Sequence, residues 1–203
     1  CYKHNVKLNF KKTNLGHGTA KFFGYELYED GYRIDQGRKD AISKIAMPGT
    51  AATPRENKKQ MKSFLGFSVY FIHFVENYAK YAAPLHDMTK DTFNWDKHTW
   101  TEDYEAHFNK FKEKLAEAMD IIYPDFSLEW CLMADASDFA CGWILVQLRP
   151  MPDGTVRAEP ISVGSEKFSV PAEVKWPINE KEAYALLRGC QTNHHLLCMK
   201  PFL

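Results

Sequence analysis

The chain has 203 residues, of which 45% are hydrophobic, 14% aromatic and 26% charged, with a formal net charge of zero. This composition supports a buried core and excludes a globally disordered protein. No apolar run approaches the ~20 residues that a bilayer demands, and the start of the chain resembles no signal peptide and lacks an initiator methionine, so we expect a soluble fragment with no membrane partner.

The charge is distributed unevenly along the chain. Residues 1–90 hold 15 Lys and Arg against 8 Asp and Glu, whereas residues 91–203 hold 11 against 18, so the halves carry +7 and −7. This asymmetry predicts that the first half faces a polyanion and that the second half is solvated or gathers carboxylates for a metal. An ordinary polar surface, unevenly divided, is the alternative. The five cysteines form no Cys-x-x-Cys pair, which favours reduced thiols.

The first predicted element is an aromatic β-hairpin. Its strands cover residues 21–28 and 32–35, with Glu29-Asp30-Gly31 as the turn. A short helix over residues 39–45 follows and stops near Pro48.

Helices dominate the middle of the chain. Thr53 predicts a helix start, because a hydroxyl cap is followed by a proline at the first helical position. Apolar residues then recur at helical spacing from Met61 to Tyr78, with a break expected near Gly66 and an end expected around Pro84. A further helix, capped by Thr99 or Thr101, buries a face that includes Phe108, Phe111 and Leu115.

After Pro124 the period changes from helix to strand. Trp130 and Leu132 alternate with polar positions, so Asp135 is expected on the face opposite to the tryptophan. Residues 142–146 are continuously apolar, as in a strand covered on both faces. A third strand around 161–163 and a helix opening at Asn179 complete the pattern, and we place a boundary between Asp120 and Asp125.

Short motifs occur in one order along nearly the whole chain. They are Lys21–Tyr25 with Glu29–Gly31, Phe64–Gly66, Tyr70–Ile72, Ala82–Leu85, Phe93–Trp95, Tyr123–Phe126, Ala134–Ser137 with Gly142 and Gln147, Pro160–Ser162, and Glu180–Glu182. Together they resemble the junction between reverse transcriptase and RNase H in the polyprotein of gypsy-type LTR retrotransposons. Any one motif is weak, but their shared order is specific.

The resemblance implies an α+β or α/β fold in three parts. Residues 1–48 would be the end of the polymerase palm with a primer-grip-like hairpin, 49–122 a helical thumb or connection region, and 123–203 the first half of an RNase H-like mixed sheet with its helix. Ala134 and residues 164–167 depart from the family pattern. The polymerase Asp-Asp turn would precede Cys1, and the third RNase H carboxylate, in a Thr-Asp-His motif, would follow Leu203. We therefore expect incomplete active sites.

The resemblance also assigns the candidate site residues. Asp135 and Glu182 would be catalytic carboxylates that bind Mg²⁺, since two-metal hydrolysis needs converging hard oxygen ligands. A turn role for Asp135 and a capping box from Asn179 to Glu182 are the alternatives. Nucleic-acid contacts are expected from Phe23, Gly24, Tyr25, Lys58, Lys59 and Lys62. For each of these the alternative is ordinary packing or solvation.

The implied parent synthesises DNA on RNA and hydrolyses the RNA of the hybrid. Its partners would be template-primer duplex, RNA:DNA hybrid and the rest of the polyprotein, within a cytoplasmic virus-like particle, with the nucleus as the alternative compartment. This chain alone is expected to bind nucleic acid without catalysis. A domesticated or truncated non-catalytic module that binds nucleic acid or a protein is the second hypothesis.

Overall fold

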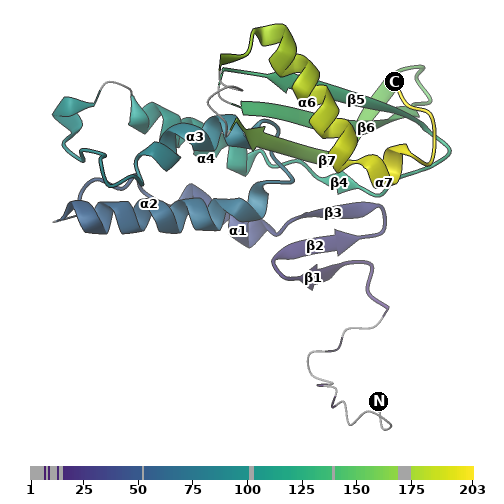
Figure 1. Ribbon diagram of the computed structural model, residues 1–203. Coiled ribbons are helices and arrows are strands. Elements are labelled where there is room, and N and C mark those ends of the chain that lie inside the picture. The colour runs from purple at the N-terminus through teal and green to yellow at the C-terminus, as the bar shows by residue number, and fades with distance from the viewer. Residues whose placement is uncertain are drawn as a thin grey trace.

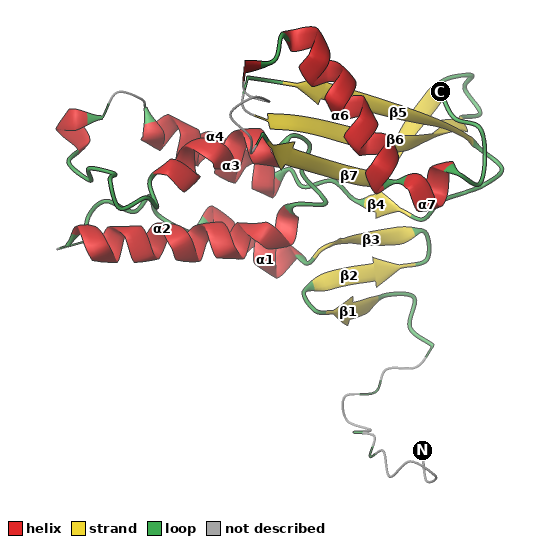
Figure 2. Cartoon of the chain, viewed as in Figure 1, coloured by secondary structure: helices red, strands yellow, loops and turns green. Residues whose placement is uncertain are grey.

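The chain folds into two antiparallel sheets with helices (Figures 1 and 2). A computed structural model describes residues 16–51, 53–100, 103–138, 140–168 and 175–203, together with Lys7, Asn9 and Thr13. The elements are β1 (Ala20–Phe22), β2 (Tyr25–Tyr28), β3 (Gly31–Ile34), α1 (Gln36–Ser43), α2 (Pro54–Ser68), η3 (Val69–Phe71), α3 (Tyr78–Asp87), η4 (Lys97–Thr99), α4 (Tyr104–Ala116), β4 (Ile121–Ile122), β5 (Glu129–Ala136), β6 (Ala140–Pro150), β7 (Val156–Lys167), α6 (Ile178–Thr192) and α7 (His194–Leu197). This mixed α+β fold agrees with the predicted class.

The first sheet has the order β1-β2-β3-β4. The predicted hairpin turn is confirmed at Glu29 and Asp30, whereas Gly31, expected in the turn, is the first residue of β3 and pairs with Tyr28. The single strand expected over residues 21–28 is wrong, since Phe22 pairs with Tyr25 around a second tight turn. Phe23 and Gly24 both have positive φ, 48° and 86°, the backbone of a type I′ turn. The fourth strand comes from far along the chain, because β3 pairs with β4.

Helix α2 begins where the sequence predicts. Thr53 is its N-cap, its hydroxyl accepts a hydrogen bond from the Glu56 N–H, and Pro54 occupies the first turn. The break expected near Gly66 is wrong, because α2 runs through it to Ser68 and the chain bends only at η3 and the turns that follow. Helix α1 starts earlier than expected, since Asp35 caps it through the Gly37 N–H.

Two further helix boundaries differ from the prediction. Helix α3 continues past Pro84 to Asp87, so that proline does not end it. Helix α4 is capped by Asp103, whose carboxylate accepts a hydrogen bond from the Ala106 N–H. Thr99 instead ends the 3-10 helix η4, and Thr101 lies outside the described residues. A carboxylate cap is also favoured by the helix dipole.

The second sheet has the order β5-β6-β7. Strand β6 is buried from Ala140 to Gln147, as its apolar sequence predicts. Strand β7 has 12 residues and is far longer than the segment expected around 161–163, because it pairs with β6 along almost its whole length across a register shift at Leu145/Val146. Figure 1 shows α6 lying across this sheet.

The two faces of the second sheet belong to different hydrophobic clusters. Trp130, Leu132 and Trp143 form one cluster with Ala185 of α6. Ile144, Val146 and Val163 belong to the larger cluster, which also contains the phenylalanines of the helical region: Phe64, Phe71, Phe74, Phe108 and Phe111. This larger core draws on all three predicted parts of the chain, and the division at residues 48 and 122 stays a prediction. Within the described residues, no helix is long and apolar enough to cross a bilayer.

Candidate functional site

An exposed aromatic pair forms the tip of the first hairpin. Phe22 is 58% and Phe23 75% exposed, and their rings meet edge to face with centroids 4.5 Å apart. A bulky residue at positive φ is uncommon and carries backbone strain, so the turn holds Phe23 outward at a cost. Exposed rings of this kind can stack on nucleobases.

Arg38 of α1 fixes this tip to the end of α2. Its Nη2 donates a hydrogen bond to the Phe23 carbonyl oxygen at 3.4 Å, and its guanidinium carbon lies 4.0 Å from the centroid of the Tyr70 ring. A Cβ atom at Gly24 would lie 1.8 Å from Arg38 Nε, so a side chain here would displace the guanidinium, and the φ of +86° also favours glycine. The predicted residues Phe23 and Gly24 are therefore held by a cation–π contact that the sequence pattern did not suggest.

Tyr25, the residue that follows the tip, packs against aromatic rings of the protein. Its ring is stacked on Phe74 with centroids 5.5 Å apart and meets Tyr32 edge to face, and the side chain is half-buried. These contacts occupy its ring faces within the protein. A direct contact of Tyr25 with nucleic acid stays a prediction.

The predicted lysines lie along α2. Lys59 and Lys62 are exposed, whereas Lys58 forms an ion pair with Asp91, which lowers the pKa of that carboxyl. Lys59 and Lys62 are three residues apart, so they follow one side of α2. From Lys59 to the helix end at Ser68 this side spans roughly 14 Å at ~1.5 Å per residue, and Tyr70 lies just beyond in η3. Arg38 and Tyr70 thus connect the tip to the end of the helix that carries the two exposed lysines.

Asp135 lies near the end of β5 with its side chain exposed. Its partner on β6 is Gly142, where a Cβ atom would lie 2.0 Å from Asn77 Oδ1. Paired residues project to the same face of a sheet, so Asp135 is on the face toward the start of α3, opposite to Trp130. This orientation is the one that the alternation predicts.

Glu182 lies early in α6 on the other side of the sheet, and its side chain is exposed. The alternative capping box is wrong, because Pro177 is the N-cap and makes no side-chain capping bond, so Asn179 already lies within the helix. Lys181 Nζ is 3.2 Å from Asp138 Oδ1, which ties the start of α6 to the end of β5. Asp135 and Glu182 therefore share one end of the sheet but leave it from opposite faces.

The predicted Mg²⁺ site needs more ligands than these two carboxylates provide. Within the described residues, no group of three or more His, Cys, Asp or Glu side chains could hold a metal ion. Two exposed carboxylates on opposite faces are a poor site for a hard divalent ion, which requires several converging oxygen ligands. Asp135 and Glu182 alone do not complete a site for a magnesium pair, and their metal role in a longer chain stays a prediction.

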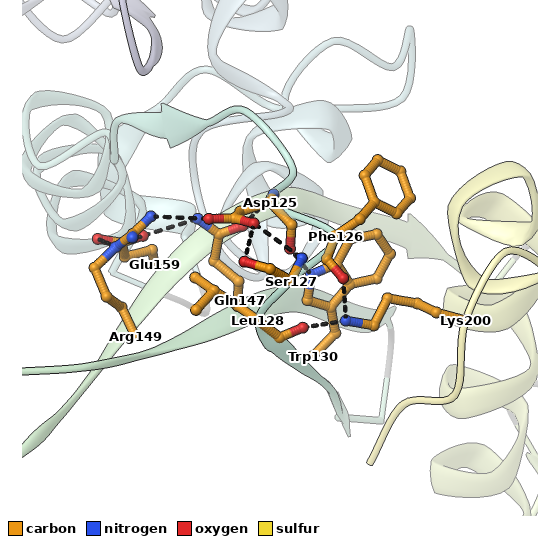
Figure 3. Close-up of polar contacts among 9 residues, drawn as sticks. All are labelled: Asp125, Phe126, Ser127, Leu128, Trp130, Gln147, Arg149, Glu159 and Lys200. Carbon is orange, nitrogen blue, oxygen red and sulfur yellow. Dashed lines mark hydrogen bonds and ion pairs between the residues drawn. The ribbon is translucent and has the colours of Figure 1, made fainter.

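Polar contacts around the buried side chains of Gln147 and Glu159 occupy the other end of the sheet (Figure 3). The Gln147 amide accepts a hydrogen bond from the Asp125 N–H at 2.8 Å and donates one to Glu159 Oε2 at 2.8 Å. Arg149 Nε is 3.0 Å from both oxygens of Glu159. Lys200 donates to the carbonyl oxygens of Phe126 and Leu128. Buried polar groups are tolerated when satisfied, so this network joins the segment before β5 to the sheet.

The fold and these surfaces define an α+β module with exposed aromatic and basic side chains at one end and a sheet that carries carboxylates at the other. The family model of the RNase H-like domain found in reverse transcriptase matches residues 100–203. The chain belongs to this family. It corresponds to the reverse-transcriptase-associated RNase H-like region of retrotransposon and retroviral Pol polyproteins.

Three relatives illustrate the match. The Pol polyprotein from transposon 412 of Drosophila melanogaster is 29% identical over 147 residues, covering 72% of this chain and 11% of that protein. The polyprotein from transposon opus of the same organism is 28% identical over 193 residues, covering 91% and 18%. The transposon Tf2-3 polyprotein of Schizosaccharomyces pombe is 26% identical over 200 residues, covering 98% and 14%. This chain spans less than a fifth of each relative.

Solved structures share the fold. The foamy viral protease-reverse transcriptase in complex with RNA/DNA hybrid has a TM-score of 0.68 and 21% identity, covering 95% of this chain and 24% of that chain. The same protein in complex with dsDNA also gives a TM-score of 0.68 at 21% identity, covering 95% and 37%. At this identity the likeness concerns architecture alone.

Proposed function

We propose that this chain is a nucleic-acid-binding segment of a retroelement reverse transcriptase and ribonuclease H, acting in a virus-like particle. It would hold template-primer duplex or RNA:DNA hybrid on the surface that runs from Phe23 to Lys59. The parent protein would carry out RNA-directed DNA synthesis and hybrid hydrolysis. Asp135 and Glu182 would contribute to the second activity once further ligands are supplied.

The observation that carries the proposal is the continuity of this surface. Phe22 and Phe23 are exposed, Arg38 connects them to Tyr70, and the exposed side of α2 continues to Lys62 and Lys59. Aromatic rings that stack on bases and lysines that neutralise phosphates are the two usual components of a nucleic-acid track. The surplus of positive charge in residues 1–90 supports the same assignment.

One contact supports an RNase H-like mixed sheet. The Leu203 N–H donates to the Trp130 carbonyl, and the Leu132 N–H donates to the Leu203 carbonyl. Leu203 therefore bonds to the two residues of β5 that flank Cys131, which is the hydrogen-bond pattern of a parallel pair of strands. Leu203 thus sits beside Cys131 on the free edge of β5. In the same register, the fourth residue after Leu203 in a longer chain would lie beside Asp135, a suitable position for a third carboxylate.

A non-catalytic binding module is the second candidate. It is favoured by the carboxylates themselves, since Asp135 and Glu182 are exposed and leave opposite faces of the sheet. In this alternative the tip surface still binds nucleic acid, and Asp135 and Glu182 have no catalytic role.

The tip residue Phe23 tests the proposal. Phe23→Ala should weaken binding of a labelled RNA:DNA hybrid by about 5- to 160-fold, because the loss of one stacked base costs ~1–3 kcal/mol. Its melting temperature should not fall, since the ring is 75% exposed. Met199→Ala, at a side chain 65% exposed elsewhere, is the control. Equal affinity of the Phe23→Ala and parent chains would refute the assigned surface.

A further inference from the structure

A second basic feature lies away from the tip, in a cleft between the two sheets. The cleft has a volume of about 700 Å³, and Tyr28, Arg33 and Asp120 line one side of it. Arg149, Arg157 and Glu159 line the other side. It therefore presents three guanidinium groups from three strands to one concave space.

Much of the hydrogen-bonding capacity of these arginines is unused. Arg33 donates from Nε to Glu26, and its Nη1 forms a longer ion pair with Asp120 Oδ2 at 3.6 Å. Arg149 likewise uses Nε for Glu159, while its Nη2 is 3.9 Å from Asp125 Oδ2. Arg157 is exposed, and within the described residues its side chain has no hydrogen bond or ion pair. Arg157 is thus the cleft arginine whose side chain has no partner among the described residues, whereas Arg33 and Arg149 hold long ion pairs at their terminal nitrogens.

Two of the arginines also oppose each other directly. Arg149 and Arg157 are register partners on β6 and β7, an arrangement in which like charges are destabilising. Glu159 compensates Arg149, but both of its oxygens are already engaged with Arg149 and Gln147. The charge of Arg157 remains without an acceptor. An anion in the cleft would relieve this repulsion.

We infer that this cleft is a phosphate-binding site, with Arg157 as its principal ligand and the Nη groups of Arg33 and Arg149 as its walls. A guanidinium fork matches two oxygens of a phosphate group. The carboxylates of the cleft are largely paired, except that Asp30 at the rim has no partner within the described residues. This balance suits one phosphodiester group better than a highly charged polyphosphate.

The cleft lies at the end of β6 away from Asp135. Arg149 is seven residues along β6 from Gly142, the partner of Asp135, which at ~3.3 Å per residue is about 23 Å. This odd spacing places the Arg149 side chain on the opposite face of the sheet from Asp135, so the cleft is separate from that carboxylate. We assign the phosphate to a nucleic-acid backbone, and this source, but not the site, rests on the proposed function.

The experiment measures the binding of a labelled RNA:DNA hybrid to the full chain at several salt concentrations. Arg157→Gln removes the unpaired cation, and Lys110→Gln removes a charge from α4, outside the cleft, as the control. Arg157→Gln should lower affinity several-fold and reduce the slope of log affinity against log salt by about 0.7 to 0.9, the share of one phosphate. Arg157→Lys should recover only part of the affinity, because lysine lacks the fork.

Asp30→Asn tests the sign of the ligand. A phosphate ligand predicts tighter hybrid binding when this carboxylate is neutralised, whereas a cationic ligand predicts weaker binding. An Arg157→Gln slope equal to that of Lys110→Gln, or weaker binding by Asp30→Asn, would overturn the site.

A competition arm with adenosine triphosphate separates the two possible sources of phosphate. Arg157-dependent binding of the nucleotide without hybrid binding would keep the phosphate site while removing both its assignment to a backbone and the proposed function. Hybrid binding that depends on Phe23 but not on Arg157 would keep the proposed function and remove the cleft site.

Discussion

The hairpin tip and the end of β5 both present exposed residues with a predicted role, but the two regions are built differently. At the tip, Phe23 is held by the Arg38 side chain, which rests on Tyr70. Three segments that are distant in sequence therefore meet on one surface. At the sheet end, Asp135 and Glu182 are exposed on opposite faces, and the local tie is between their neighbours Lys181 and Asp138.

This difference separates binding from hydrolysis. A surface for stacking and charge neutralisation needs only exposed rings and cations in a fixed arrangement, which the tip provides. A two-metal centre needs several oxygen ligands within a few ångströms of one another, and the described residues do not supply them. We therefore expect the chain to bind hybrid and to leave it intact.

Hydrolysis should show the largest effect. The 203-residue chain should neither extend primers nor cut an RNA:DNA hybrid in Mg²⁺. In a longer chain with a carboxylate beside Asp135, Glu182→Gln should reduce cleavage by roughly 100-fold or more, a loss typical of one preorganised charged or polar group, because an amide is a poor ligand for a hard ion. Hybrid cleavage is followed on a gel and stability by melting. If the 203-residue chain cut the hybrid and Asp135→Asn abolished this cleavage, the conclusion that the chain binds hybrid without hydrolysing it would be wrong.

Stability of the tip should depend on Gly31. A Cβ atom there would lie 2.2 Å from the Ile121 carbonyl oxygen of β4, so Gly31→Ala should lower the free energy of unfolding by ~1–3 kcal/mol through overpacking. Gly66→Ala is the matched control, since nothing lies within 4 Å of the added carbon and alanine favours the helix by ~1 kcal/mol. Urea titration measures both. Equal stabilities would mean that the pairing of β3 with β4 is dispensable.

The lysines of α2 should have a smaller effect, on binding alone. Lys59→Gln with Lys62→Gln should weaken hybrid binding by about tenfold in moderate salt and lower the salt slope by about 1.5, the share of two phosphates. The same change at Lys110 and Lys114 of α4 is the control. Fluorescence anisotropy over a range of salt concentrations measures both. If residues 91–203 alone bound as tightly as the whole chain, the assignment of binding to the first half would fail.

The smallest effect concerns pH. Partial desolvation of the imidazole, aided by Lys167, holds the pKa of His86 below its usual value although the residue as a whole is exposed, and Asp87 opposes this shift. The unfolded chain therefore takes up this proton more readily than the folded protein. The resulting stability is fully present above pH ~6.5 and is lost as pH falls through the folded pKa.

His86→Gln should thus flatten the fall in urea midpoint between pH 7.5 and pH 5. His98→Gln, at an exposed histidine, is the matched control. An unchanged pH dependence in His86→Gln would assign this fall to other groups.

Much of the fold follows from local patterns. The α2 start at Thr53, the face of Asp135 and the buried strand β6 depend on capping chemistry or on strict alternation, which act within a few residues. Boundaries set by tertiary contacts were predicted poorly. Pro84 is accommodated inside α3, and β7 reaches 12 residues because β6 is its template.

The candidate site shows the same limit. Phe23 and the lysines could be chosen from residue type and family resemblance, but the stacking of Arg38 on Tyr70 joins residues 32 positions apart. The one local signal was Gly24, whose positive φ turns the strand back. The cleft arginines come from β3, β6 and β7, and no sequence spacing brings them together.

The partial pairing of β5 at Leu203 has a consequence for solubility. Beyond that contact, the outer edge of β5 over Met133–Ala136 has no other backbone partner among the described residues, and Met133 is 47% exposed. An open edge invites a second chain to add a strand, and charged side chains discourage this. Asp135 carries the one charge in that stretch. Its replacement by asparagine would remove the charge that disfavours edge-to-edge pairing with a second chain. Light scattering should therefore accompany any activity test of that variant.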